Sequence, residues 1–131
     1  MRQPIFIFVL RNNNPIKEIM EKRTEKRKHF LHCNIAGFTY WEGCIAFKEL
    51  KMGSKLELVR EEHNKHDADA VAIYYKEMKL GYIPKYHNEL ISLFLHMGHS
   101  DVFEARVCRI DSEAHPEHQV YVNIYIMHKD Q

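Results

Sequence analysis

The 131-residue chain lacks the features of several protein classes. Its three cysteines, Cys33, Cys44 and Cys108, are an odd number without Cys-x-x-Cys spacing, which argues against a disulfide framework and favours a reducing, cytoplasmic location. The apolar run at residues 5–10 spans only six residues. It is too short for a transmembrane helix and lacks the cleavage site of a signal peptide. We therefore expect a cytoplasmic protein without a membrane partner, in which this run forms a strand or a packing segment.

Motifs of the common catalytic classes are also missing. The sequence has no Gly-rich phosphate loop, no Gly-x-Ser-x-Gly elbow and no helicase motif. Four His-x-x-His pairs occur among the ten histidines, but structural zinc needs four convergent ligands, usually with thiolates, and only Cys33 lies beside a pair. We expect no enzymatic activity, no cofactor and no metal site.

The net charge of +1 is unevenly distributed along the chain. Residues 1–30 hold eight basic and three acidic side chains, which leaves eleven basic and fifteen acidic side chains for residues 31–131. Residues 16–28 contain good helix formers after Pro15 and predict a basic helix that is highly charged in its second half. This helix is either a solubilising tether or an electrostatic arm for phosphate or an acidic partner. Its candidate phosphate contacts are Lys22, Arg23, Lys26, Arg27 and Lys28.

Alternating apolar residues predict short strands at residues 30–38, 55–60, 70–75, 78–83, 102–110 and 120–126. Helical spacing predicts a helix over residues 87–97, with Gly98 as its cap. Five to six antiparallel strands with one inserted helix indicate a mainly β (α+β) fold, a small and partly open barrel similar to the OB fold. We expect one domain at residues 31–131 behind an extension at residues 1–30, because a chain of this length buries a core unaided.

Two segments are candidates for binding. Tyr40 and Trp41 lie between glycines, so at least one ring should project from a loop, where aromatic faces stack on unpaired bases with about 1–3 kcal/mol per base. Alternatively, Trp41 plugs one end of the barrel. The second segment is the polar loop that contains Asn64 and Asp67. An ionised Asp only accepts hydrogen bonds, so it suits a free hydroxyl and repels phosphate; alternatively, both residues only shape the loop backbone.

Three ordered blocks of sequence resemble the HIRAN domain over about residues 31–127. They are IAGFTYWEG at residues 35–43, REEHNKHDADAVAI at residues 60–73 and LGYIP at residues 80–84. The resemblance implies a domain in which the aromatic pair stacks on the terminal bases of single-stranded DNA, while the Asn and Asp of the loop surround the terminal sugar and its 3′-hydroxyl. In such domains the segment that contains Tyr82 and Lys85 lies beside this loop.

The resemblance therefore predicts a stand-alone HIRAN protein of bacterial type that binds single-stranded DNA at its 3′-hydroxyl end in DNA repair or at replication forks. A helicase or nuclease would be its partner protein. The expected contact residues are Thr39, Tyr40, Trp41, Asn64, His66, Asp67, Tyr82 and Lys85.

Three departures from the family pattern leave a second function open. Thr39 stands where many relatives have a basic residue, Glu62 replaces a common Pro, and His66 stands where Tyr is frequent. Together with the acidic body, these residues weaken attraction to phosphate. The alternative is a protein-interaction module that uses the barrel or the N-terminal strand to bind a peptide or to self-associate.

Overall fold

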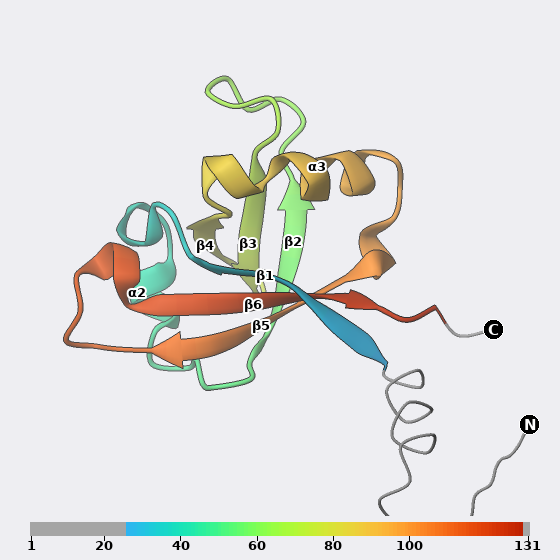
Figure 1. Ribbon diagram of the computed structural model, residues 1–131. Coiled ribbons are helices and arrows are strands. Elements are labelled where there is room, and N and C mark those ends of the chain that lie inside the picture. Colours follow the sequence, from blue (N-terminus) through green and yellow to red (C-terminus); the bar gives the residue numbers. More distant parts are fainter. Residues whose placement is uncertain (1–25, 130–131) are drawn as a thin grey trace, which may run out of the picture.

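Six antiparallel strands form one sheet in the computed structural model, which describes residues 26–129 (Figure 1). The strands are β1 (Arg27–Asn34), β2 (Lys55–Arg60), β3 (Val71–Tyr75), β4 (Met78–Tyr82), β5 (Phe103–Ile110) and β6 (Val120–Met127). The helices are α2 (Gly43–Ala46) and α3 (Glu89–His96), with 3-10 turns η1 (Phe38–Tyr40), η2 (Lys85–His87), η3 (Ser100–Val102) and η4 (Pro116–His118). Among these described residues, no helix is long and apolar enough to cross a membrane.

The sheet bends into a partly open barrel. Its strand order is β1-β6-β5-β2-β3-β4, and β2 pairs with β5 only through Lys55 and Leu56 before it turns away to pair with β3. The two halves of the sheet therefore cross at a steep angle (Figure 1). The edge strands β1 and β4 do not form a ladder, but the chain just beyond β1 pairs with β4 at a single bridge between Ala36 and Tyr82. The predicted mainly β, partly open architecture is confirmed.

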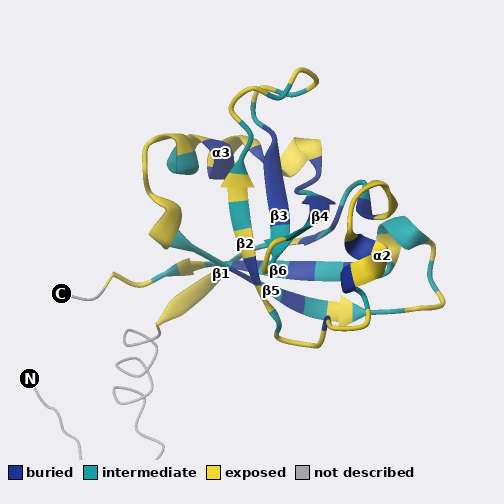
Figure 2. Ribbon diagram, turned by 180° about the vertical axis from the view of Figure 1, so that it is seen from behind, coloured by how far each residue is buried: buried dark blue, intermediate teal, exposed yellow. Residues whose placement is uncertain are grey.

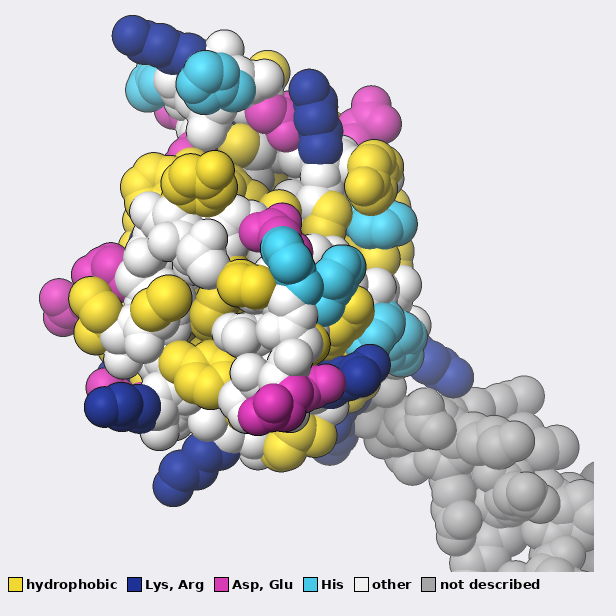
Figure 3. Space-filling view, turned by 90° about the vertical axis from the view of Figure 1, so that its left-hand side faces the viewer, with side chains coloured by type: hydrophobic (Ala, Val, Ile, Leu, Met, Phe, Trp, Pro, Cys, Tyr) yellow, Lys and Arg dark blue, Asp and Glu magenta, His cyan; other side chains and the backbone are white. Residues whose placement is uncertain are grey.

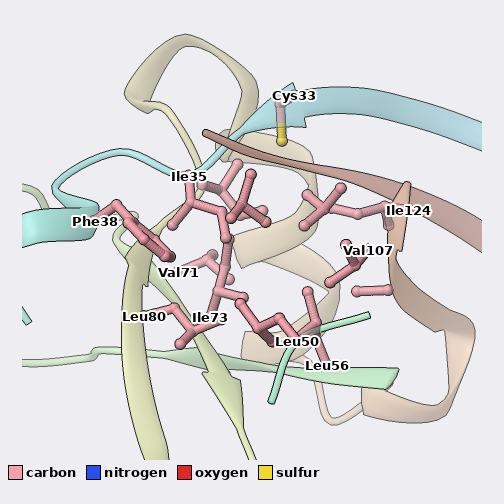
Figure 4. Packing of buried hydrophobic residues seen from close by; sticks show 14 of the residues in the cluster. Cys33, Ile35, Phe38, Leu50, Leu56, Val71, Ile73, Leu80, Val107 and Ile124 are labelled. Carbon is pink, nitrogen blue, oxygen red and sulfur yellow. The ribbon is translucent and has the colours of Figure 1, made fainter. Parts of the chain in front are cut away.

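The core lies between the two halves of the sheet. Alternate residues of β6 point inward, so Val120, Val122 and Ile124 are buried while their neighbours face solvent (Figure 2). They meet buried side chains of the other half, including Ile73 (Figure 4). Helix α3 adds the fully buried Ile91. Each such side chain contributes about 1.5–3 kcal/mol through removal from water.

Most of the predicted strands and the helix lie within two residues of their observed positions, but the first strand differs. β1 covers Arg27–Asn34 instead of residues 30–38, because Gly37 adopts a φ of +73° and the chain leaves the sheet for η1. Arg27 and Lys28 were expected at the end of the basic helix; that expectation is wrong, since both lie in β1. Helix α2 was not predicted. The rest of the expected helix and the apolar run at residues 5–10 lie outside the described residues.

Gly81 is the position at which a side chain would damage the fold most directly. Its φ is +149°, and an added Cβ would overlap the carbonyl oxygen of Ala36 and lie 2.8 Å from Cγ2 of Ile35. We expect Gly81→Ala to lower the free energy of unfolding by about 3 kcal/mol or more, through backbone strain and the loss of the bridge to β4. Urea denaturation with Gly53→Ala as the control checks this, because Gly53 also has positive φ but has open space around it. An equal loss of unfolding free energy in the two variants would contradict the role assigned to the close approach at Gly81.

Candidate functional site

The turn after β1 presents two aromatic side chains to solvent. Phe38 anchors this turn in the core at 1% exposure, and Gly43 packs so closely on it that a Cβ there would lie 2.6 Å from the carbonyl oxygen of Phe38. Between these two anchors, Tyr40 is 85% exposed and Trp41 is 44% exposed. The alternative in which Trp41 plugs the barrel is wrong, because Phe38 is the ring that this turn buries.

Trp41 is held in place by two side chains of β4. The ammonium nitrogen of Lys79 lies 3.7 Å from the centroid of the Trp41 ring, a cation–π contact worth about 0.5–2 kcal/mol. The ring of Tyr82 meets the indole edge to face, with centroids 5.9 Å apart and planes at 76°. The indole is thus fixed on one side while almost half of the residue stays open to solvent.

A half-buried network of three polar side chains supports this contact. Lys79 Nζ donates to Glu61 Oε2 at 2.5 Å and to the Tyr82 hydroxyl at 2.7 Å, and that hydroxyl donates to Glu61 Oε1 at 2.7 Å. Burial alone would raise the pKa of Glu61, but hydrogen bonds from Lys79, Tyr82 and Asn64 outweigh it and lower that pKa. Burial would likewise lower the pKa of Lys79, but its bonds to Glu61 and Tyr82 raise that pKa above its ordinary value. Both groups are therefore charged at neutral pH.

The polar loop between β2 and β3 is fixed by its own side chains. Asn64 Nδ2 donates to Glu61 Oε1 at 3.0 Å, and Asn64 Oδ1 accepts from the backbone N–H groups of His66 and Asp67 at 2.8 and 3.0 Å. Asp67 Oδ1 accepts from the backbone N–H of Asp69 at 2.9 Å. The expectation that Asn64 and Asp67 shape the loop is confirmed. Each oxygen of Asp67 accepts one hydrogen bond and so retains a lone pair for a ligand, whereas Asn64 Oδ1 already accepts two and only holds the loop.

Asp67 also ties this loop to the start of α3. Its Oδ2 accepts from Nδ2 of Asn88 at 2.8 Å, and Asn88 is 2% exposed. A buried amide with a charged acceptor forms one of the stronger hydrogen bonds in the molecule. The position of the Asp67 carboxylate is therefore set from both sides, by its own loop and by the residue that precedes α3.

The structure brings the predicted residues together to different degrees. Trp41, Tyr82 and Asn64 belong to one connected network. Thr39 lies exposed in η1, His66 lies exposed in the loop, and Lys85 begins η2 with no ion pair among the residues that the structure describes. A hollow of about 340 Å³ lies elsewhere, between β2, β5 and η3, and none of the predicted site residues lines it.

The central pair of the network, Glu61 and Lys79, was missed by the sequence reasoning. Eighteen positions separate the two residues, and they meet because β2 pairs with β3 and β3 with β4, with a register shift between Ile73 and Tyr74 that places Lys79 opposite Tyr74. A lysine next to a Leu-Gly-Tyr segment carries no local signal for this. Only the strand register together with this shift could have indicated the contact.

The predicted phosphate contacts of the extension have separate outcomes. Lys22 and Arg23 lie outside the described residues, and Lys26 directly precedes β1. Arg27 is 44% exposed, donates to Glu104 Oε1 at 2.6 Å and lies over the ring of Tyr125. In the described part of the chain, no cluster of three or more His, Cys, Asp or Glu side chains could hold a metal ion.

The network makes a pH-dependent contribution to stability. Because the folded state lowers the pKa of Glu61 from 4.5, the stabilisation is present above pH 4.5 and is lost as the pH falls through the lowered value. We expect Glu61→Gln to reduce the free energy of unfolding by about 1–3 kcal/mol at pH 7, with the difference from wild type shrinking by pH 3. Urea denaturation at both pH values measures this.

The matched control is Glu49→Gln, whose partner Lys76 lies 3.2 Å away on the surface, with both side chains more than half exposed. Such a surface pair contributes little to stability. The free energy of unfolding of this variant should therefore stay close to that of wild type at both pH values. If Glu61→Gln lowers the free energy of unfolding by the same amount at pH 3 as at pH 7, the loss of the Glu61 charge is not the cause.

Comparison with known proteins identifies the family. A family model described as the HIRAN domain matches residues 28–129. A crystal structure of a protein from Lactobacillus plantarum, a structural genomics target, has a similar fold, with a TM-score of 0.64, 22% sequence identity, and coverage of 78% of this chain and 97% of that chain. None of the curated proteins matches the chain. Because the family model covers most of the sequence, the chain belongs to the HIRAN domain family, whose domains generally bind DNA.

Proposed function

We propose that this domain binds single-stranded DNA at a free 3′-hydroxyl end, in a DNA repair or replication-fork context, without catalysing a reaction. The observation that carries the proposal is the arrangement of Trp41, which is held on Lys79 yet 44% exposed. Single-strand binders use such rings as stacking platforms. An immobilised ring loses little conformational freedom when a base stacks on it, so its geometry favours binding.

Tyr40 and Trp41 would stack the terminal bases. The two residues are adjacent in the chain, and both are exposed beyond the end of β1. Lys79 offsets the nearby charge of Glu61, since the two groups form an ion pair. The pair therefore adds no net charge beneath the indole, and the exposed carboxylate beside the platform is that of Glu42.

The loop would select the hydroxyl end. Asp67 offers oxygen acceptors in fixed positions, Asn64 holds the loop beside it, and Glu62 adds a further exposed carboxylate to the same loop. A terminal sugar hydroxyl can donate to these oxygens, whereas a 3′-phosphate would bring two like charges together. His66, Tyr82 and Lys85 complete the proposed contact set, with Thr39 beside the aromatic pair. A helicase or nuclease partner would then act on the DNA end, in the cytoplasm.

End recognition can be tested by fluorescence anisotropy with labelled oligonucleotides that end in a 3′-hydroxyl or a 3′-phosphate. We expect wild type to prefer the hydroxyl end, and Trp41→Ala to weaken both complexes about tenfold or more through lost stacking. Asp67→Asn should bind the 3′-phosphate oligonucleotide more tightly than wild type does, because the repelling charge is gone. The preference for the 3′-hydroxyl end should therefore become smaller. That gain of binding cannot arise from misfolding.

Met52→Ala is the control variant, because Met52 is 65% exposed and lies in the turn before β2. It should bind both strands as wild type does. Equal binding of wild type to the two ends would rule out end recognition. Binding that is unaffected by Trp41→Ala but is abolished by deletion of residues 1–25 would rule out the aromatic platform.

A second candidate function is a protein-interaction module, favoured by one face of α3. Leu90, Leu93 and Met97 are 47%, 52% and 64% exposed at helical spacing and form an apolar stripe beside the described barrel. Salt separates the two candidates. Binding to single-stranded DNA should weaken with a logarithmic slope of about −0.7 per phosphate contact, whereas an apolar interface hardly responds to salt.

A further inference from the structure

The outer face of the β1–β6–β5 half of the sheet carries a row of ring side chains that the proposed site does not use. Because β6 buries its even-numbered residues from 120 to 124, the intervening Tyr121, Asn123 and Tyr125 face outward. The neighbouring strand β1 places His32 opposite Asn123 and His29 opposite Tyr125. We call His118, Tyr121, His32, His29 and Tyr125 the ring strip.

The rings of the strip form two contact groups, one of His118, Tyr121 and His32 and one of His29 and Tyr125. His118 and Tyr121 are near parallel, with centroids 6.2 Å apart, and His118 Nδ1 lies 3.0 Å from the Tyr121 hydroxyl. Tyr121 stacks on His32 at 5.3 Å with an interplanar angle of 14°. His29 meets Tyr125 edge to face at 5.8 Å. The strip is therefore an ordered array rather than a set of independent surface side chains.

Asn123 fixes the middle of the strip. Its Oδ1 lies 3.1 Å from His29 Nε2 and 3.0 Å from His32 Nδ1, so one amide oxygen holds two imidazoles. A surface asparagine that orders two rings limits their rotation, and a ring that is already ordered loses less entropy when a ligand stacks on it. The strip thus shares with Trp41 the ordering of its rings, while the tyrosines are half-buried and the histidines exposed.

Arginine side chains lie over the tyrosine rings of this face. The guanidinium carbon of Arg27 lies 3.9 Å from the Tyr125 centroid, and that of Arg109 lies 5.6 Å from the Tyr121 centroid. Glu104 accepts hydrogen bonds from both Arg27 and Arg106, so two guanidinium groups share one carboxylate, and Asp111 lies 3.7 Å from Arg109. The strip thus has three arginines beside Glu104, Asp111 and Glu117, a balanced charge in a body in which acidic side chains outnumber basic ones.

The strip is continuous with the turn that presents the aromatic pair. Glu117, next to His118 in η4, accepts from the backbone N–H of Gly37 at 3.0 Å, and its carbonyl accepts from Asn34 Nδ2 at 2.9 Å. Gly37 in turn begins η1, which contains Tyr40. Histidine side chains gather on this side of the molecule beside Lys and Arg side chains (Figure 3). The strip thus leads from the proposed site toward the basic beginning of β1.

We propose that the ring strip is a second stacking surface for single-stranded DNA, which holds the part of the strand that leads away from the bound 3′ end. Rings that alternate with guanidinium groups match the chemistry of unpaired bases joined by phosphates. Tyr121 to Tyr125 spans about 13 Å along β6, so contact requires a strand longer than the end site can hold. The inference rests on the proposed function, because the strand enters from that site.

A length series tests the strip with the full chain. Anisotropy is measured for 3′-hydroxyl oligonucleotides of about four and about twelve nucleotides, within the range of site sizes of OB folds. The double variant Tyr121→Ala/Tyr125→Ala should bind the long strand about tenfold or more weakly than wild type does, and the short strand equally well. The matched control, Tyr121→Phe/Tyr125→Phe, keeps the rings and should bind both strands as wild type does.

An NMR titration of wild type makes the test independent of how the alanine variant folds. We expect the backbone amide signals of Tyr121, Asn123 and Tyr125 to shift with the long strand and to stay in place with the short one. If the long strand shifts only signals near Trp41 and the alanine variant binds this strand as wild type does, the ring strip does not bind DNA. The proposal of 3′-end binding is then unaffected. If wild type binds neither strand, the proposed function itself fails.

Discussion

The pairing of Ala36 with Tyr82 is the constraint on which the candidate site depends. Ala36 N–H donates to the carbonyl of Tyr82 at 2.8 Å, and Tyr82 N–H donates back at 2.9 Å. These two bonds bring the chain beyond β1 against the opposite edge of the barrel, so the turn that carries Trp41 lies on β4. Glu42 continues this contact, because its N–H donates to the carbonyl of Lys79 at 2.7 Å and its Oε1 accepts from the Lys79 N–H at 3.0 Å. Gly81 makes the approach possible because no Cβ stands between the two backbones.

The half-buried ion pair of Lys79 and Glu61 positions the candidate site in addition to its contribution to stability. Removing two charges from water costs several kcal/mol, and their attraction offsets this only when every remaining donor and acceptor is satisfied. Here the Tyr82 hydroxyl and the amide of Asn64 complete the set. The same carboxylate thereby connects the platform under Trp41 to the loop of Asn64, so the two proposed contact regions have a fixed relative position.

The sequence was informative wherever a local pattern decides the structure. Period-two alternation located β5 and β6, and helical spacing located α3, because each buries one face against a single core. Local propensity was misleading at Arg27 and Lys28, where charged helix formers continue a helical pattern but pairing with β6 places them in a strand. The contact of Lys79 with Glu61 depends on the register of three strands, and no short-range pattern encodes it.

Trp41 is the one tryptophan in the sequence, and its indole lies 3.7 Å from an ammonium group on a partly open surface. The near-ultraviolet emission of the whole protein therefore originates largely from a single ring in the candidate site. Any molecule that covers this ring or displaces Lys79 alters the local field and solvent around the indole. The domain thus carries an intrinsic optical reporter of its own occupancy, which needs no label and leaves the DNA chemistry of the ligand unmodified.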